Sequence, residues 1–170
     1  MKLMIASDIH GSAYWCRKLC EKFNSENPDR LLLLGDILYH GPRNDLPREY
    51  DPKSVIKMLN FIADKIRCVR GNCDTEVDQM VLDFSIMSDS TVIYDGETEI
   101  FAMHGHNIDL PKLQKIKKGT VVMCGHTHIR EDTIKDGLRY VNPGSVSIPK
   151  ADTRNGYVIY ENGGFRFCDL

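Results

Sequence analysis

Five short apolar runs along the chain each end abruptly in a polar cluster. The runs cover residues 2–6, 31–34, 67–70, 100–103 and 121–124. Short continuous apolar runs are typical of buried strands, and a polar cluster after each one places polar side chains at a strand end. We therefore expect five buried strands that deliver polar groups to one edge of a sheet.

Two stretches between the first three runs have helical spacing. Ser12 can cap a helix that continues to about Phe23, and Asp51 followed by Pro52 begins a second helix that reaches Ala63. The first half of the chain is therefore predicted to have the order β-α-β-α-β.

The second half is predicted to be mostly β. Turn sequences at 95–96, 136–137 and 162–164 indicate hairpins, with short strands at 133–135 and 138–141 and one short helix at 110–116. Neither a repeat nor a Gly/Ser-rich linker divides the sequence, so residues 1–170 are predicted to form one domain. We expect an α/β protein with a two-layered β-sandwich flanked by helices.

Composition and charge narrow the function. The 170 residues carry a net charge of −2, which provides no general basic field for stable nucleic-acid binding or for an anionic membrane. The N-terminal apolar run is interrupted by Asp8 and His10 before it could form a signal or a membrane span, so a cytoplasmic location is expected. The six cysteines lack a C-x-x-C spacing and are expected to be reduced thiols.

Two of the polar clusters contain a pair of metal-binding side chains two residues apart. Extended residues at this spacing project from the same face, so Asp8 with His10, and His126 with His128, could each approach one cation. Either pair alone is also typical of a solvated surface loop.

Three further donors follow the other apolar runs. Asp36 offers an oxygen that could bridge two cations, Asn72 a neutral carbonyl oxygen and His104 a further nitrogen. A glycine adjoins a candidate ligand in each of the five clusters, which permits tight turns and close backbone approach. Surface loops do not predict this arrangement, whereas a metal site at the strand ends does.

The ordered series of clusters resembles the calcineurin-like metallophosphoesterase superfamily. The matching residues are Asp8-x-His10, Gly35-Asp36, Gly71-Asn72, His104 and Gly125-His126-x-His128. Segments 40–44, 70–74 and 142–149 are similar to the small YfcE-type bacterial phosphodiesterases within that superfamily. The resemblance covers nearly the whole chain and implies the α-β-β-α metallophosphoesterase fold.

The resemblance also implies a ligand set for two divalent cations. One cation would be held by Asp8, His10, Asp36 and His128, and the other by Asp36, Asn72, His104 and His126. The mixed carboxylate, amide and imidazole donors suit Mn²⁺, Zn²⁺, Fe or Ni²⁺ better than Ca²⁺, and the resemblance favours manganese. A hydroxide bridging the two ions would then attack the phosphorus of an ester.

Other polar residues near the clusters are candidates for substrate contact. Many relatives place a His directly after the Asn of the third cluster, whereas this chain has Cys73, which is a poorer acid for the leaving group at neutral pH. His106 could touch the phosphate, support a ligand or be a solvated or hydrogen-bonded loop histidine, and Arg43 could clamp a phosphate. For His40 and for the turn at 142–145, structural roles are favoured. Asp74 could orient a ligand or cap the following helix, and the capping and structural roles are favoured.

Rival functions remain open on the sequence alone. We expect a phosphodiesterase that acts on a small substrate, with a phosphomonoesterase as an alternative. Some proteins of this fold, such as a subunit of the retromer sorting complex, act as interaction scaffolds, but here every matched ligand position carries a competent donor, which favours catalysis. A metal-dependent regulatory or storage module and a homo-oligomer are also compatible with the sequence.

Overall fold

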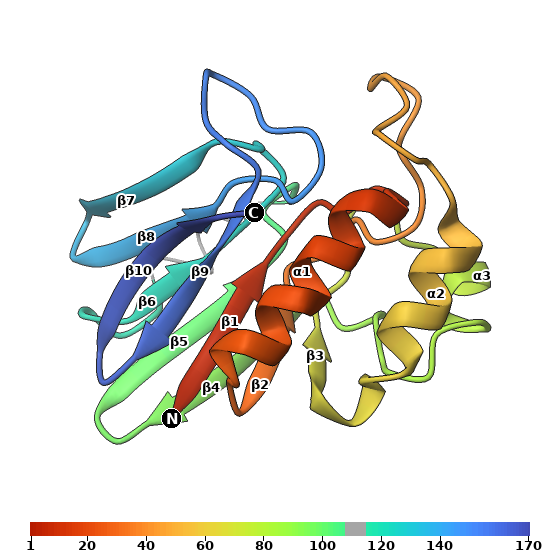
Figure 1. The fold of residues 1–170 in the computed structure, drawn as a ribbon. Coiled ribbons are helices and arrows are strands. Elements are labelled where there is room, and N and C mark those ends of the chain that lie inside the picture. Colours follow the sequence, from red (N-terminus) through yellow and green to blue (C-terminus); the bar gives the residue numbers. More distant parts are fainter. Residues whose placement is uncertain (108–114) are drawn as a thin grey trace.

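The computed structural model describes residues 1–107 and 115–170, which contain two five-stranded sheets (Figure 1). The first sheet comprises β1 (Lys2–Ala6), β2 (Arg30–Leu33), β3 (Ile66–Cys68), β9 (Gly156–Glu161) and β10 (Gly164–Asp169), in the order β10-β9-β1-β2-β3. The second comprises β4 (Ser90–Asp95), β5 (Thr98–Met103), β6 (Val121–Met123), β7 (Arg130–Lys135) and β8 (Leu138–Pro143), in the order β4-β5-β6-β8-β7.

The five apolar runs form strands within one or two residues of the predicted bounds. However, they belong to two sheets and not to one. Strands β1, β2 and β3 pair in parallel in the first sheet, and β5 and β6 pair in parallel in the second. Strands that run in parallel end on the same side of their sheet, so each sheet presents its own polar edge. The expectation of a single sheet edge was therefore wrong, because β4 and β5 start a second layer.

The helices of the first half begin where they were predicted. Helix α1 (Ala13–Glu26) is capped by the Ser12 side chain, which accepts a hydrogen bond from the Trp15 amide. Helix α2 (Pro52–Asn60) is capped by Asp51 in the same way. Helix α2 ends before the predicted Ala63, where the 3₁₀ turn η1 (Ala63–Lys65) leads into β3. A short helix, α3 (Glu76–Gln79), follows β3, and the helix predicted at 110–116 lies mostly outside the described residues.

Two apolar layers hold these elements together. One lies between the sheets and is built by alternate side chains of β1, β2, β5, β6, β8 and β9, including Ile5, Leu32, Ala102, Met123 and Val158. The other lies between the first sheet and helices α1 and α2, and includes Met4, Cys16, Leu19, Val55 and Leu59. The two-layered β-sandwich with flanking helices is thus confirmed.

The last two strands occupy a place that the local pattern did not predict. β9 pairs antiparallel with β1, and β10 with β9, so the C-terminus of the chain returns to the first sheet. All six cysteines are free thiols, as expected. Among the described residues, no helix has both the length and the apolar character needed to cross a bilayer.

Candidate metal centre

The candidate ligands lie in the loops that directly follow the strand ends. Five of the seven have left-handed backbone conformations, with φ angles from 49° to 66°: Asp8, His10, Asp36, His126 and His128. The prediction that Asp8 and His10 project from extended backbone was therefore wrong, and the same holds for His126 and His128. Non-glycine residues rarely adopt this region, which costs of the order of 1–3 kcal/mol each where it is strained. Tertiary contacts must hold the five side chains in these positions.

Glycines allow the loops to approach one another closely. A Cβ at Gly71 would collide with the carboxylate and the amide of Asp36. A Cβ at Gly125 would collide with the Ser7 side chain and lie 2.9 Å from Oδ2 of Asp8. Each glycine brings the backbone of one cluster against a candidate ligand of another, as the sequence predicted for glycines beside ligands.

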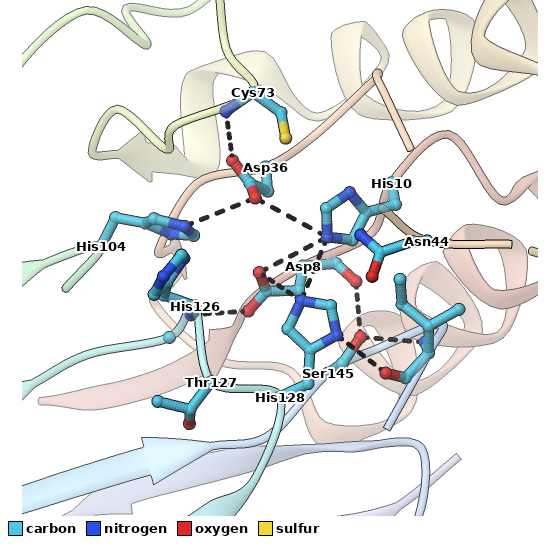
Figure 2. Close-up of polar contacts among 12 residues, drawn as sticks. Asp8, His10, Asp36, Asn44, Cys73, His104, His126, Thr127, His128 and Ser145 are labelled. Carbon is cyan, nitrogen blue, oxygen red and sulfur yellow. Dashed lines mark hydrogen bonds and ion pairs between the residues drawn. The ribbon is translucent and has the colours of Figure 1, made fainter. Parts of the chain in front are cut away.

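Asp8, His10 and His128 form a buried triad (Figure 2). Oδ1 of Asp8 lies 3.6 Å from Nε2 of His10 and 3.2 Å from Nε2 of His128. The two Nε2 atoms are 3.3 Å apart. One carboxylate oxygen and two imidazole nitrogens therefore converge on the same small volume.

Asp36 lies between this triad and His104. Its Oδ2 is 3.7 Å from Nε2 of His10 and 3.4 Å from Nε2 of His104. Its Oδ1 accepts a hydrogen bond of 2.8 Å from the backbone amide of Cys73. One oxygen is thus fixed by the backbone, and the other faces imidazoles on both sides.

The opposite ring nitrogens of three imidazoles are held by backbone carbonyls. Each Nδ1 is at hydrogen-bond distance from a carbonyl oxygen: His10 from Tyr39 at 2.8 Å, His104 from Leu34 at 2.6 Å, and His128 from Ile148 at 2.8 Å. A carbonyl can only accept, so each Nδ1 must carry the proton. In the neutral tautomer, Nε2 then offers its lone pair to the centre of the site, as in metal-binding histidines.

These contacts fit a bound cation. Two Nε2 lone pairs facing each other at 3.3 Å repel one another unless a positive charge lies between them. Oδ1 of Asp8 is buried and accepts no hydrogen bond from the described residues, which is costly for a charged oxygen. A divalent cation would satisfy both the oxygen and the nitrogens.

The remaining two candidate ligands lie on the solvent side of His104. Oδ1 of Asn72 is 3.1 Å from Nε2 of His104, and the ring centroid of His126 is 5.1 Å from that of His104. Asn72 is exposed and His126 half-buried. The fold therefore brings all seven sequence-predicted ligands together. Four form a buried group around Asp8, and three form a more open group, in which His104 is buried but Asn72 is exposed and His126 half-buried.

The electrostatics of the site favour positive charge. Burial opposes ionisation of Asp8, but the adjacent His10 and His128 hold its pKa well below the usual range. Burial alone would lower the pKa of His104, yet the carboxylates of Asp36 and Asp8 raise it to about 9. The carboxylates thus attract positive charge to this volume, which a proton or a metal ion can supply.

Asp74 fixes the loop that carries Asp36. Its carboxylate accepts hydrogen bonds from the amides of Asp36, Ile37 and Gly71, at 2.8, 2.9 and 2.7 Å. The predicted helix cap is wrong, because Thr75 caps α3 and leaves the Asp74 side chain free to point the other way. Asp74 therefore positions the ligand that lies between the two groups.

The turn at 142–149 supports the other group. Ser145 and Ser147 both donate their hydroxyls to the carbonyl of Asp8, at 2.8 and 3.1 Å. Asn142 donates to the carbonyl of Gly125 at 2.8 Å, and the carbonyl of Ile148 holds the His128 ring. This segment fastens the second sheet to the ligand loops, in line with the structural role expected for it.

A cavity of about 390 Å³ opens over the ligands. Its walls include Asp36, Asn72, Cys73, His126 and His128, together with Arg43, the residue predicted to clamp a phosphate. Asn44, Thr127 and Lys150 also line it. Sequence reasoning missed these three. Asn44 and Lys150 do not directly follow an apolar run, and Thr127, which lies between His126 and His128, is not a usual metal ligand. Arg43 and Lys150 form no ion pair with any described residue.

The remaining candidates occupy different positions. The His106 ring lies 5.4 Å from that of His104 and 6.2 Å from that of His126, which places it beside the open group. His40 packs edge-on between Tyr39 and Tyr50, consistent with the structural role expected for it. Burial and the carboxylates of Asp36 and Asp74 raise the pKa of the Cys73 thiol to about 12.

Fold and site together define a metallophosphoesterase. Residues 1–163 match the calcineurin-like phosphoesterase superfamily domain, and the chain belongs to this family. It is 41% identical to phosphodiesterase YfcE of Escherichia coli K12 over 162 residues, which cover 95% of this chain and 88% of that protein. The solved structure of E. coli YfcE, described as a phosphoesterase, superposes with a TM-score of 0.91 over 95% of this chain and 89% of that one.

More distant relatives share the same fold. Phosphodiesterase MJ0936 of Methanocaldococcus jannaschii is 28% identical over 85% of this chain and 83% of its own length. A zinc complex of Vps29 from Entamoeba histolytica superposes with a TM-score of 0.64 over 98% of this chain and 96% of that one, but is only 18% identical. The Vps29 likeness therefore shows the fold alone.

Proposed function

We propose that this protein is a phosphodiesterase that uses two divalent cations. The observation that carries the proposal is the position of Asp36, whose Oδ2 faces His10 on one side and His104 on the other. A carboxylate oxygen between two sets of donors suits a ligand shared by two ions. The names of the E. coli and M. jannaschii relatives support the choice of a phosphodiester as substrate.

The seven donors divide between the two ions as the family resemblance implies. In this assignment, Asp8, His10, Asp36 and His128 would hold one ion, the buried ion, and Asp36, Asn72, His104 and His126 would hold the other, the open ion. The mixed oxygen and imidazole donors suit Mn²⁺, Zn²⁺, Ni²⁺ or Fe better than Ca²⁺, and the family resemblance favours manganese among them. None of the seven is a thiolate, which would have favoured zinc.

When bound, the two ions supply Lewis acidity that activates a water and stabilises charge on the phosphoryl oxygens. The protein's own side chains position the substrate. Arg43 and Lys150 at the cavity wall provide positive charge for the phosphate. The Cys73 thiol, with its raised pKa of about 12, is a weak proton donor at neutral pH, so diesters with good leaving groups are the preferred substrates.

Several wider properties are part of the same proposal. We propose one domain over residues 1–170, a cytoplasmic location, a small-molecule substrate and no stable nucleic-acid binding. A homo-oligomer is compatible with the proposal, and light scattering tests it. The scaffold alternative is disfavoured because all seven candidate donors are present and brought together.

Metal reconstitution tests the proposed function. The protein is stripped of metal, supplied with Mn²⁺, Zn²⁺, Ni²⁺ or Mg²⁺ singly, and assayed with bis(p-nitrophenyl) phosphate beside p-nitrophenyl phosphate. We expect Mn²⁺ to support diester hydrolysis best, and Asp36→Ala and His126→Ala to abolish it, while the exposed Asp64→Ala serves as a matched control. The proposal is contradicted if the metal-free protein hydrolyses the diester, or if both ligand variants keep full activity. Faster hydrolysis of the monoester than of the diester selects the phosphomonoesterase alternative.

A further inference from the structure

A second groove shares one wall residue, Cys73, with the candidate active-site cavity. It has a volume of about 360 Å³, and its walls include Tyr39, Tyr50, Cys73, Val77 and Val81. Cys73 also lines the cavity over the candidate ligands. Cys73, which lies beside Asp36, is thus a wall residue of both hollows.

The walls of the two hollows differ in chemistry. The active-site cavity carries Arg43, Lys150 and the polar ligands, whereas the groove is walled mainly by apolar and aromatic side chains. Several of these are exposed: Tyr39 by 42%, Val77 by 69% and Val81 by 43%. Apolar side chains that gather in a concave surface are typical of a site for an apolar group.

The groove is anchored to the metal centre. The Tyr39 carbonyl accepts the hydrogen bond from Nδ1 of His10 at 2.8 Å, so the residue that forms one wall also orients a candidate ligand. On the other side, Tyr50 packs edge-on against the His40 ring, with centroids 5.2 Å apart. A group in this groove would therefore lie at a fixed position relative to the phosphate.

A phosphodiester carries two organic groups, here called its arms, each joined through an ester bond to one phosphate with a single negative charge. We propose that this groove binds one aromatic or other apolar arm of the substrate, while the charged phosphate occupies the cavity beside Arg43 and Lys150. This inference rests on the proposed function and narrows its substrate class to diesters with at least one apolar arm. Position 73 suits the junction, because a neutral thiol borders an apolar group more favourably than a charged imidazole would.

Binding of two simple diesters tests the inference. Dissociation constants of diphenyl phosphate and dimethyl phosphate are measured on zinc-loaded protein by NMR titration, which requires no turnover. Both ligands carry the same charge. The ratio of the dissociation constant of dimethyl phosphate to that of diphenyl phosphate therefore isolates the contribution of the arms. We expect diphenyl phosphate to bind roughly tenfold more tightly, since part of one aromatic ring is removed from water.

Variants of the exposed groove wall locate the effect. The double variant Val77→Ser/Val81→Ser should reduce the ratio at least about threefold by loss of apolar contact area, and leave the affinity for dimethyl phosphate unchanged. Met80→Ser is the matched control, because Met80 is on the same segment and 83% exposed but does not line the groove.

The outcomes separate this inference from the proposed function. A ratio near one in the wild type, or an unchanged ratio in the double variant, overturns the inference. An equal loss for both ligands also overturns it, because the variants would then act on the phosphate site. If the ratio behaves as expected and no metal supports hydrolysis, the groove assignment stands and the proposed catalytic function fails.

Discussion

The two halves of the candidate metal centre differ in how firmly the fold holds them. In the buried half, His10 and His128 are pinned, which here means that each donates a hydrogen bond from Nδ1 to a backbone carbonyl. The carbonyl of Asp8 also accepts hydrogen bonds from two serine hydroxyls. In the open half, His104 is pinned by Leu34, but Asn72 is exposed and His126 half-buried.

This difference indicates that the two ions have different roles. Pinned ligands lose little conformational entropy when a cation binds, so the buried half is preorganised to hold its ion tightly. The open half borders the cavity lined by Arg43 and Lys150, where ligands that can adjust suit an ion that also meets substrate. We therefore expect unequal affinities for the two ions.

The largest expected effect is the change in metal affinity when one histidine is removed from either half. His128→Ala should lower the affinity for the tighter-binding ion by more than roughly 100-fold. The reason is that removing only the hydrogen-bond partner of a ligand already lowers metal affinity by about 10–100-fold. His126→Ala should lower the affinity for the other ion and leave the affinity for the tighter-binding ion nearly unchanged. Calorimetric titration of metal-free protein with Mn²⁺ resolves the two steps, and equal effects of the two variants would contradict the comparison.

The second effect concerns the loop shared by both halves. Asp74→Asn leaves at least one of three buried amides without an acceptor and removes the charge, so we expect a loss of about 2–3 kcal/mol in the free energy of unfolding. Urea denaturation of the metal-free protein measures it, with the exposed Asp64→Asn as control. A variant as stable as wild type would mean that the loop does not depend on Asp74.

A smaller effect is expected at the border of the open half. Cys73→His introduces a group that can protonate a leaving oxygen near neutral pH, so turnover of diesters with poor leaving groups should rise about tenfold or more. Diesters with p-nitrophenolate as the leaving group should respond less. Cys73→Ser, which adds no such acid, is the control, and an equal gain with both substrates would exclude acid catalysis as the reason.

The smallest effect lies far from both halves. Burial opposes ionisation of Glu26, but hydrogen bonds from Arg166 and Lys2 lower its pKa below the usual value. A lowered pKa stabilises the fold above the unfolded pKa of about 4.3, and this contribution is lost as pH falls through the folded pKa.

Glu26→Gln should therefore cost less than about 1 kcal/mol at pH 7 and still less at roughly pH 3, which lies below the unfolded pKa. Urea unfolding at the two pH values measures this difference. Metal affinity should stay as in wild type in both halves, and a change there would show that the metal centre is coupled to the sheet edge at β10.

The sequence by itself determined the strand ends and the donors that follow them. Both are local properties: a buried strand requires a short apolar run, and the residues directly after it must lie at the sheet edge. For the same reason the capped starts of α1 and α2 could be predicted from Ser12 and Asp51. The end of α2 could not, because η1 replaces its last turn.

Only the tertiary structure decided how these donors meet. The two edges belong to different sheets, and the left-handed backbone of Asp8 and His128 is imposed by contacts with residues far along the chain. Nδ1 of His128 is held by the carbonyl of Ile148, and the loop of Asp36 by Asp74. The same long-range packing places Lys150 in the cavity wall and makes Cys73 a wall residue of both the cavity and the groove. Such contacts have no periodic signature, since they arise only when separate segments fold against one another.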